Sequence, residues 1–132
     1  MLHDVNVLVV DDNPLAVSLL TMVLEDSYAT ICSAGSIKEA FDKLNNKKID
    51  IILLDLDLPD NKDIKIVGEF QKVYPQIPVV IITGIVSQDL NKQAISYGAQ
   101  DILIKGNMDS EKIVLTVYHS IERQKRWVWK NS

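Results

Sequence analysis

A short apolar run, residues 51–54, ends on the aspartate Asp55, and this arrangement constrains the fold more than any other feature. The run reads IILL and is followed by the polar and turn-forming stretch LDLPD, which is typical of a strand buried on both faces. A carboxylate at the last position of such a strand emerges at its carboxyl end, where open α/β sheets place their ligand crevice. We therefore expect a parallel sheet with a functional site at that edge.

Strand-like apolar runs alternate with helical segments along the whole chain. The strands are predicted over residues 6–10, 28–33, 49–54, 78–82 and 101–104, and the helices over residues 14–26, 37–44, 64–74, 88–97 and 110–126. Capping signals support several of these boundaries, because Asn13 precedes Pro14, Ser36 lies three residues before Glu39, and Gly98 follows a helical segment. The alternation predicts a doubly wound α/β domain with about five parallel strands.

The bulk composition excludes several classes of protein. With 132 residues, of which 47% are hydrophobic, the chain can form one domain with its own core. The net charge of -4 gives no reason to expect nucleic-acid binding. Cys32 is the single cysteine, so no internal disulfide can form, and its apolar surroundings predict a small core residue. The chain lacks a signal peptide pattern and an apolar stretch of about 20 residues, so we expect a cytoplasmic domain without membrane contact.

Polar residues follow four of the predicted strands. They are Asp11 and Asp12 after the first strand, Asp55 after the third, Thr83 after the fourth and Lys105 after the fifth. Because the carboxyl ends of parallel strands meet at one edge, we expect these side chains to lie together. Three carboxylates so close need a bound cation or proton, and Mg²⁺ prefers such oxygen ligands. The two histidines, in contrast, have no neighbouring ligands that would indicate a metal site.

Four motifs occur in a fixed order along the chain: the pair Asp11-Asp12, then LDLDLP over residues 54–59, ITG over residues 82–84, and GAQD with IK over residues 98–105. With these motifs the chain resembles the receiver domain of two-component response regulators over about residues 5–123. The resemblance implies a flavodoxin-like (βα)₅ fold with strand order 2-1-3-4-5. It divides the chain into a receiver domain, residues 1–123, and a carboxyl-terminal tail or linker to a further domain, residues 124–132.

The resemblance also implies a function and its residues. Asp55 would accept a phosphoryl group from a phosphohistidine of a sensor histidine kinase or phosphotransfer protein, and Lys105 and Thr83 would contact that group. Mg²⁺ would bind Asp12, Asp55 and the backbone carbonyl of Asp57, with Asp11 acting through water. An aspartate is a known nucleophile for phosphoryl groups, and such transfer depends mainly on positioning and charge neutralisation. The domain would be a signalling switch, and not an enzyme with an external substrate.

Three positions depart from the receiver pattern. Ile102 stands where many receivers carry an aromatic residue, so the usual relay from Thr83 to that residue is not expected. Gly106 replaces the proline that often follows the lysine, so the peptide bond from Lys105 to Gly106 is predicted to be trans. The loop over residues 60–64 lacks the glycine that is common there. These departures concern the output mechanism and leave the acceptor site intact.

Two other functions remain open. The chain could be a degenerate receiver that binds partners without phosphorylation. It could also be a phosphatase of the haloacid dehalogenase type, because Asp57 lies two residues after Asp55, as the acid/base of those enzymes does. The effector domain or target is not specified by the sequence. Because Trp127 and Trp129 follow a charged helix, the last helix is expected either to lead into a further module or to pair in a homodimer. The alternative is that the helix frays and the two rings fold back onto this domain.

Overall fold

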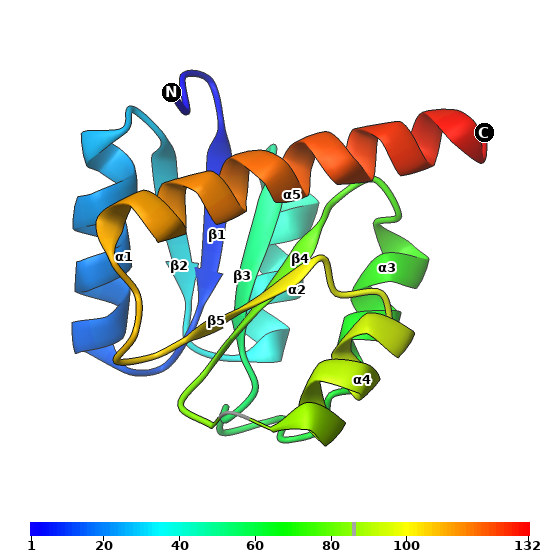
Figure 1. The fold of residues 1–132 in the computed structure, drawn as a ribbon. Coiled ribbons are helices and arrows are strands. Elements are labelled where there is room, and N and C mark those ends of the chain that lie inside the picture. The colour runs from blue at the N-terminus through cyan, green and yellow to red at the C-terminus, as the bar shows by residue number, and fades with distance from the viewer. Residues whose placement is uncertain (86) are drawn as a thin grey trace.

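The computed structural model describes residues 1–85 and 87–132, and within them five strands alternate with five helices (Figure 1). The strands are β1 (Asn6–Val10), β2 (Thr30–Ala34), β3 (Ile51–Asp55), β4 (Val79–Thr83) and β5 (Asp101–Ile104). The helices are α1 (Pro14–Asp26), α2 (Ile37–Asn46), α3 (Ile66–Val73), α4 (Gln88–Ser96) and α5 (Ser110–Lys130). All strand pairs are parallel and the order is β2-β1-β3-β4-β5, which confirms the predicted fold.

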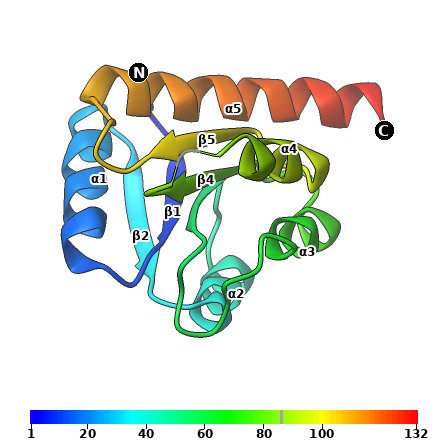
Figure 2. The same ribbon diagram turned by 60° about the horizontal axis from the view of Figure 1, so that its bottom comes forward.

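Helices cover both faces of the sheet. Figure 2 shows α5 over one face and α2 and α3 over the opposite face. The strands serve both layers because successive side chains point to opposite faces. In β3, Ile51 and Leu53 pack in the core under α1 and α5, whereas Ile52 and Leu54 pack in the core under α2, α3 and α4. The central strands are therefore buried on both sides, as their continuous apolar sequences predict.

The predicted capping residues begin and end helices in the structure. The side chain of Asn13 accepts hydrogen bonds from the backbone amides of the first turn of α1, with Pro14 at the first helical position. Ser36 Oγ accepts from the amide of Glu39 at 3.1 Å, and the Glu39 carboxylate accepts from the amide of Gly35 at 3.2 Å. Gly98, which follows α4, has a φ of 100°, a conformation that glycine adopts without strain.

Strands β2 and β3 and helix α3 each begin two residues later than predicted. Strand β2 begins at Thr30 and not at residue 28, because Tyr28 has a φ of 74° and so cannot continue an extended strand. Helix α3 begins at Ile66 and not at residue 64, because the preceding residues form a turn in which the Asp63 carboxylate accepts from the amide of Lys65 at 3.0 Å. None of the described peptide bonds is cis, so the predicted trans bond before Gly106 is confirmed.

Helix α5 is longer than predicted and ends at Lys130. The segment contains no glycine or proline, so nothing in the sequence interrupts it. Its end projects past the rest of the molecule in both ribbon views (Figures 1 and 2). Gln124 is only 3% exposed, and its amide donates to Pro75 O at 2.7 Å and to Gln71 Oε1 at 2.9 Å. The helix therefore crosses the expected boundary at residues 123 and 124 without a break.

Candidate functional site

The register of the sheet places the predicted site residues at one edge. Val10 pairs with Leu54, so Asp11 follows β1 where Asp55 ends β3. Thr83 ends β4 opposite Ile104, and Lys105 follows β5 directly. The backbone amide of Lys105 also donates to Thr83 O at 2.7 Å, which joins the last two strand ends. The structure thus brings together the groups that the sequence places after separate strands.

Three aspartates form the acidic part of this edge. Asp11, Asp12 and Asp55 each offer a carboxylate oxygen, and these oxygens lie within 4.8 Å of one another. Asp11 is 3% exposed and Asp55 is 6% exposed, whereas Asp12 faces solvent. A cation could reach this cluster from the solvent side and meet buried ligands behind Asp12.

Lys105 supplies the positive charge of the site. Its ammonium lies 3.0 Å from Asp11 Oδ2 and 3.3 Å from Asp55 Oδ2. Burial disfavours the charged ammonium, but the contacts with Asp11 and Asp55 outweigh it and raise the pKa of Lys105. The lysine therefore stays charged at neutral pH and partly neutralises the two buried carboxylates.

The environment of Asp55 opposes its ionisation. Burial raises the pKa of the Asp55 carboxyl, and the nearby charge of Asp11 raises it further. The hydrogen bond from the amide of Asp57 to Asp55 Oδ1, at 3.2 Å, and the charge of Lys105 act in the opposite direction. The net effect is a raised pKa, so the ionised cluster has an excess of negative charge that a cation would relieve.

One oxygen of Asp11 has the environment of a metal ligand. Asp11 Oδ1 accepts from the amide of Asn13 at 2.9 Å. Oδ2 is buried and accepts no hydrogen bond from the described residues, although Lys105 lies close to it in an ion pair. The ammonium of Lys105, 3.0 Å away, is the charged group that meets this oxygen, and a carboxylate oxygen has a further lone pair that can take a cation or a water. This oxygen, with those of Asp12 and Asp55, fits a hard cation such as Mg²⁺, either directly or through a bound water.

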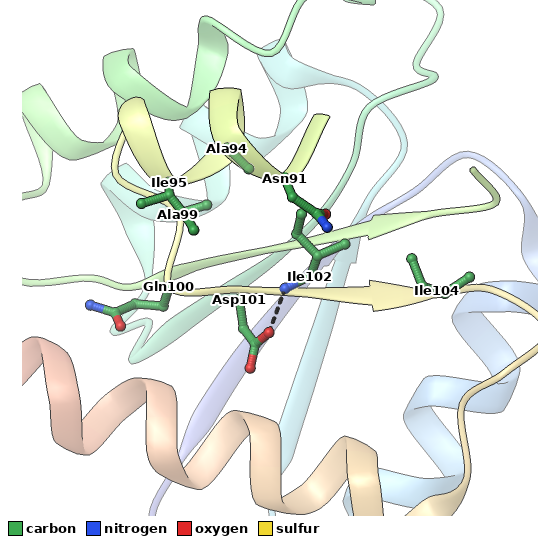
Figure 3. Close-up of a pocket in the computed structure, with 8 residues that line it drawn as sticks. All are labelled: Asn91, Ala94, Ile95, Ala99, Gln100, Asp101, Ile102 and Ile104. Atoms are coloured by element: carbon green, nitrogen blue, oxygen red, sulfur yellow. Dashed lines mark hydrogen bonds between the residues drawn. The ribbon is translucent and has the colours of Figure 1, made fainter. Parts of the chain in front are cut away.

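Thr83 and Ile102 lie on neighbouring strands. Thr83 is 7% exposed, and its hydroxyl accepts from the amide of Ile85 at 3.2 Å. Ile102 lies on β5 and lines a pocket of about 350 Å³ beside α4, together with Asn91 and Ile95 (Figure 3). The residues that line this pocket do not include those of the acidic cluster.

The loop after β3 contains two contacts that the sequence does not predict. Asp57 is exposed and forms an ion pair with Lys62, which also donates to Leu58 O at 3.3 Å. The carboxylate of Asp60 accepts from the backbone amides of Ile37 and Lys38, at 2.9 and 3.1 Å, and so caps α2 from a distant part of the chain. The only sequence signal for either contact is the charged stretch Asp60-Asn61-Lys62-Asp63. The sequence of this stretch does not predict which residues its side chains contact.

The two histidines lie outside the acidic cluster. The ring of His3 stacks on Tyr28, with centroids 4.5 Å apart, and the ring of His119 packs edge-on against Tyr118. Cys32 is a free thiol that is half-buried against the core, and burial raises its pKa. In the part of the chain that the structure describes, no helix has the length and hydropathy needed to cross a bilayer.

Comparison with known proteins decides the family of this chain. The family model of the response regulator receiver domain matches residues 7–118. The chain belongs to this family. The receiver domain is 38% identical over 98 residues to the response regulator protein PilR of Pseudomonas aeruginosa, covering 74% of this chain and 22% of PilR. It is 31% identical over 119 residues to the transcriptional regulatory protein ZraR of Klebsiella oxytoca, covering 90% of this chain and 27% of ZraR.

Solved structures agree with this assignment. The receiver domain matches the solution structure of the beryllofluoride-activated NtrC4 receiver domain dimer with a TM-score of 0.83 and 31% identity, covering 90% of this chain and 98% of that one. A CheY-like receiver domain protein from Methanospirillum hungatei matches at a TM-score of 0.82 and 20% identity, covering 92% of this chain and 97% of that one, which supports the fold alone. The chain spans about a quarter of the length of the curated relatives PilR and ZraR.

Proposed function

We propose that Asp55 receives a phosphoryl group from a phosphohistidine of a partner kinase or phosphotransfer protein. The main support is the position of Lys105, whose ammonium reaches both Asp55 and Asp11 at the edge where three carboxylates converge. In the transfer, a carboxylate oxygen of Asp55 attacks phosphorus and the phosphorus–nitrogen bond of the donor breaks. The electron pair of that bond leaves with the imidazole. Lys105 stabilises the negative charge of the phosphoryl oxygens during this step.

Mg²⁺ is the proposed cofactor. Its carboxylate ligands would come from Asp12 and Asp55, with the backbone carbonyl of Asp57 as a further ligand and Asp11 acting through a water molecule. When bound, the ion supplies neutralisation of the phosphoryl charge. The protein's own part is to hold the oxygens of the three aspartates within 4.8 Å of one another and to keep Asp11 and Asp55 away from bulk water.

The phosphoryl group would then change the loop around Thr83. A phosphoryl group adds nearly two negative charges and three acceptor oxygens. The Thr83 hydroxyl accepts from the amide of Ile85 and can also donate its proton to a phosphoryl oxygen. A movement of the Thr83 side chain towards that oxygen would release the amide. Ile102 has no ring to rotate, so we propose that the response spreads by movement of the loop and α4, without an aromatic relay.

The proposed partners are a sensor histidine kinase or phosphotransfer protein and an effector domain or target that is not yet identified. PilR and ZraR are named as regulators and are about four times longer than the matched region, so this domain would act within or beside a larger assembly. A second copy of this chain, bound through α5, is a further proposed partner. We propose a location in the cytoplasm, where the free thiol of Cys32 would remain reduced, with no direct binding of nucleic acid or membrane.

Neither alternative function is favoured by the site. A receiver that binds partners without phosphorylation does not need all of Asp11, Asp12, Asp55 and Lys105. All four are present and lie together here, which favours a receiver that is phosphorylated. A phosphatase of the haloacid dehalogenase type would need Asp57 as acid/base beside an enclosed substrate. The side chain of Asp57 is instead 84% exposed and paired with Lys62.

The direct test is labelling with acetyl phosphate. The wild-type chain should gain one phosphoryl group by intact mass spectrometry in the presence of Mg²⁺, and little after chelation of the metal. Asp55→Asn should not be labelled, whereas Asp63→Asn, which changes an exposed carboxylate in the same loop, should be labelled like the wild type. Labelling of Asp55→Asn would refute the assignment of the acceptor. An unlabelled wild type with Mg²⁺ and a cognate phosphodonor would favour the phosphorylation-independent module.

A further inference from the structure

The loop that follows the acceptor strand contains a second cation near the site, Lys62. Its ammonium forms an ion pair with Asp57, which lies two residues after Asp55. The same ammonium donates to the backbone oxygen of Leu58, the next residue, at 3.3 Å. The Asp57 amide in turn donates to Asp55 Oδ1. Lys62 is therefore linked to the acceptor through a single residue, and Asp12 and Asp55 lie close enough for their charges to act on it.

An exposed ion pair usually contributes little, because two flexible side chains must be ordered. Here the loop itself holds the two partners together. Leu58 and Asn61 exchange backbone hydrogen bonds of 3.1 and 3.4 Å, which closes the chain between Asp57 and Lys62 into a tight turn.

Asp60, at the middle of this turn, is fixed to the first turn of α2 by its hydrogen bonds with Ile37 and Lys38. The turn is thus anchored to a helix on one side and to the acceptor strand on the other. The placement of Lys62 beside Asp57 is a product of this anchored turn.

We propose that Lys62 is a positioning residue that holds the Asp57 carboxylate away from the acceptor and thereby prolongs the lifetime of the phosphoryl group on Asp55. This inference rests on the proposed function. Hydrolysis needs a water whose oxygen attacks phosphorus while the bond from phosphorus to the Asp55 oxygen breaks. The electron pair of that bond returns to the Asp55 carboxylate, and both water protons leave with the phosphate as dihydrogen phosphate.

A free carboxylate at Asp57 could accept a hydrogen bond from this water and orient it for attack. Paired with Lys62, the same carboxylate is directed to the ammonium and its charge is neutralised. Lys62 thus acts through Asp57 and does not need to touch the phosphoryl group. The arrangement predicts that loss of Lys62 accelerates hydrolysis only when Asp57 can still accept a hydrogen bond from water.

The test is a double-mutant cycle on the rate of phosphoryl loss. Wild type, Lys62→Met, Asp57→Ala and the double variant are labelled with acetyl phosphate and Mg²⁺, the donor is removed, and released phosphate is followed over time. Lys62→Met should lose phosphate faster than wild type, by up to about fivefold, the most that breaking one exposed ion pair allows. The double variant should lose it at the rate of Asp57→Ala. Lys62→Arg keeps the charge and should restore the wild-type rate.

Lys65→Met is the matched control, because Lys65 is an exposed lysine near the same loop, and its rate should equal that of wild type. An unchanged or slower rate in Lys62→Met would overturn the inference. So would an equal acceleration in the Asp57→Ala background, since Lys62 would then act directly on the phosphoryl group. A wild type that cannot be labelled at all would refute the proposed function, and the inference with it, and this outcome is visible before any rate is measured.

Discussion

Lys105 and Asp11 form an ion pair, with Nζ of Lys105 3.0 Å from Oδ2 of Asp11. That oxygen is buried and accepts no hydrogen bond from the described residues, so the ammonium is the charge that faces it. The same ammonium lies 3.3 Å from Asp55 Oδ2. Lys105 thus partly neutralises the carboxylates proposed to bind Mg²⁺, and its ammonium would repel a metal ion bound there.

Replacing Lys105 should therefore strengthen metal binding and weaken phosphorylation. Lys105→Met is expected to bind Mg²⁺ about three- to tenfold more tightly, because one positive charge beside the metal ligands is removed. Its labelling by acetyl phosphate should slow by about tenfold or more, because the transition state loses a cation. Isothermal titration calorimetry and single-turnover labelling measure the two effects, with Lys72→Met, an exposed lysine of α3, as control. Weaker Mg²⁺ binding in Lys105→Met would contradict this account.

Thr83 should couple the acceptor to the rest of the domain. Thr83→Ala removes the hydroxyl that accepts from the amide of Ile85, so Asp55 should still be labelled but the loop should no longer respond. Amide hydrogen exchange of α4 and β5, measured with and without beryllofluoride, should change in the wild type and change much less in Thr83→Ala. Thr83→Ser keeps the hydroxyl and should respond like the wild type. Identical exchange changes in all three proteins would show that the switch does not use Thr83.

Asp60 should stabilise the protein in a pH-dependent way. Hydrogen bonds from the amides of Ile37 and Lys38 lower the pKa of Asp60 below its ordinary value of 3.8. Between the lowered pKa and 3.8 the unfolded chain binds more protons than the folded one, so stability falls as the pH falls through this window. Asp60→Ala should cost about 1 kcal/mol at pH 7, the usual effect of losing a helix cap.

Urea unfolding of the wild type and Asp60→Ala at several pH values tests this prediction. The difference in unfolding free energy should be constant near neutral pH and shrink below pH 3.8. Asp42→Ala, which removes an exposed carboxylate from α2 itself, should cost much less. A difference that grows as the solution becomes more acidic would have the wrong sign for a carboxylate cap.

Gln124 should contribute to stability through its buried amide. Its side chain donates to Pro75 O and Gln71 Oε1 and accepts from Gln100 Nε2 at 2.7 Å. Gln124→Ala leaves these partners unpaired and should lower the free energy of unfolding by about 1–3 kcal/mol. Lys125→Ala, at the next and exposed position, should change it far less. Equal unfolding midpoints for the two variants would mean that the side-chain amide of Gln124 does not contribute to stability.

The end of α5 should mediate self-association. Trp127 is 55% exposed and Trp129 is 82% exposed, an apolar surface that favours burial against another surface. The burial of Gln124 shows that a truncation must begin after it, so residues 1–126 are the appropriate short form. By analytical ultracentrifugation the full chain should associate with rising concentration, while residues 1–126 should remain monomeric and fold with unchanged stability. If the full chain and residues 1–126 are both monomeric, the end of α5 has no role in self-association.

The resemblance to receiver domains implies the strand order, whereas the sequence pattern itself predicts a parallel sheet and places the candidate site at its carboxyl edge. These features depend on local signals: apolar runs of strand length, helix caps such as Asn13 and Ser36, and aspartates directly after strands. The identity of Asp55 as the central carboxylate follows from the same signals, because a residue that ends a buried parallel strand can emerge only at that edge.

Only the tertiary structure decided which distant groups meet. Asp60 caps α2 across 23 residues of sequence, and Gln124 bonds to Gln71 across 53. The pairing of Lys62 with Asp57 likewise follows from a particular turn. Propensity and periodicity act over a few residues along the chain, whereas these contacts depend on how whole elements pack, and a hydrogen bond forms only when that packing brings donor and acceptor within about 3 Å.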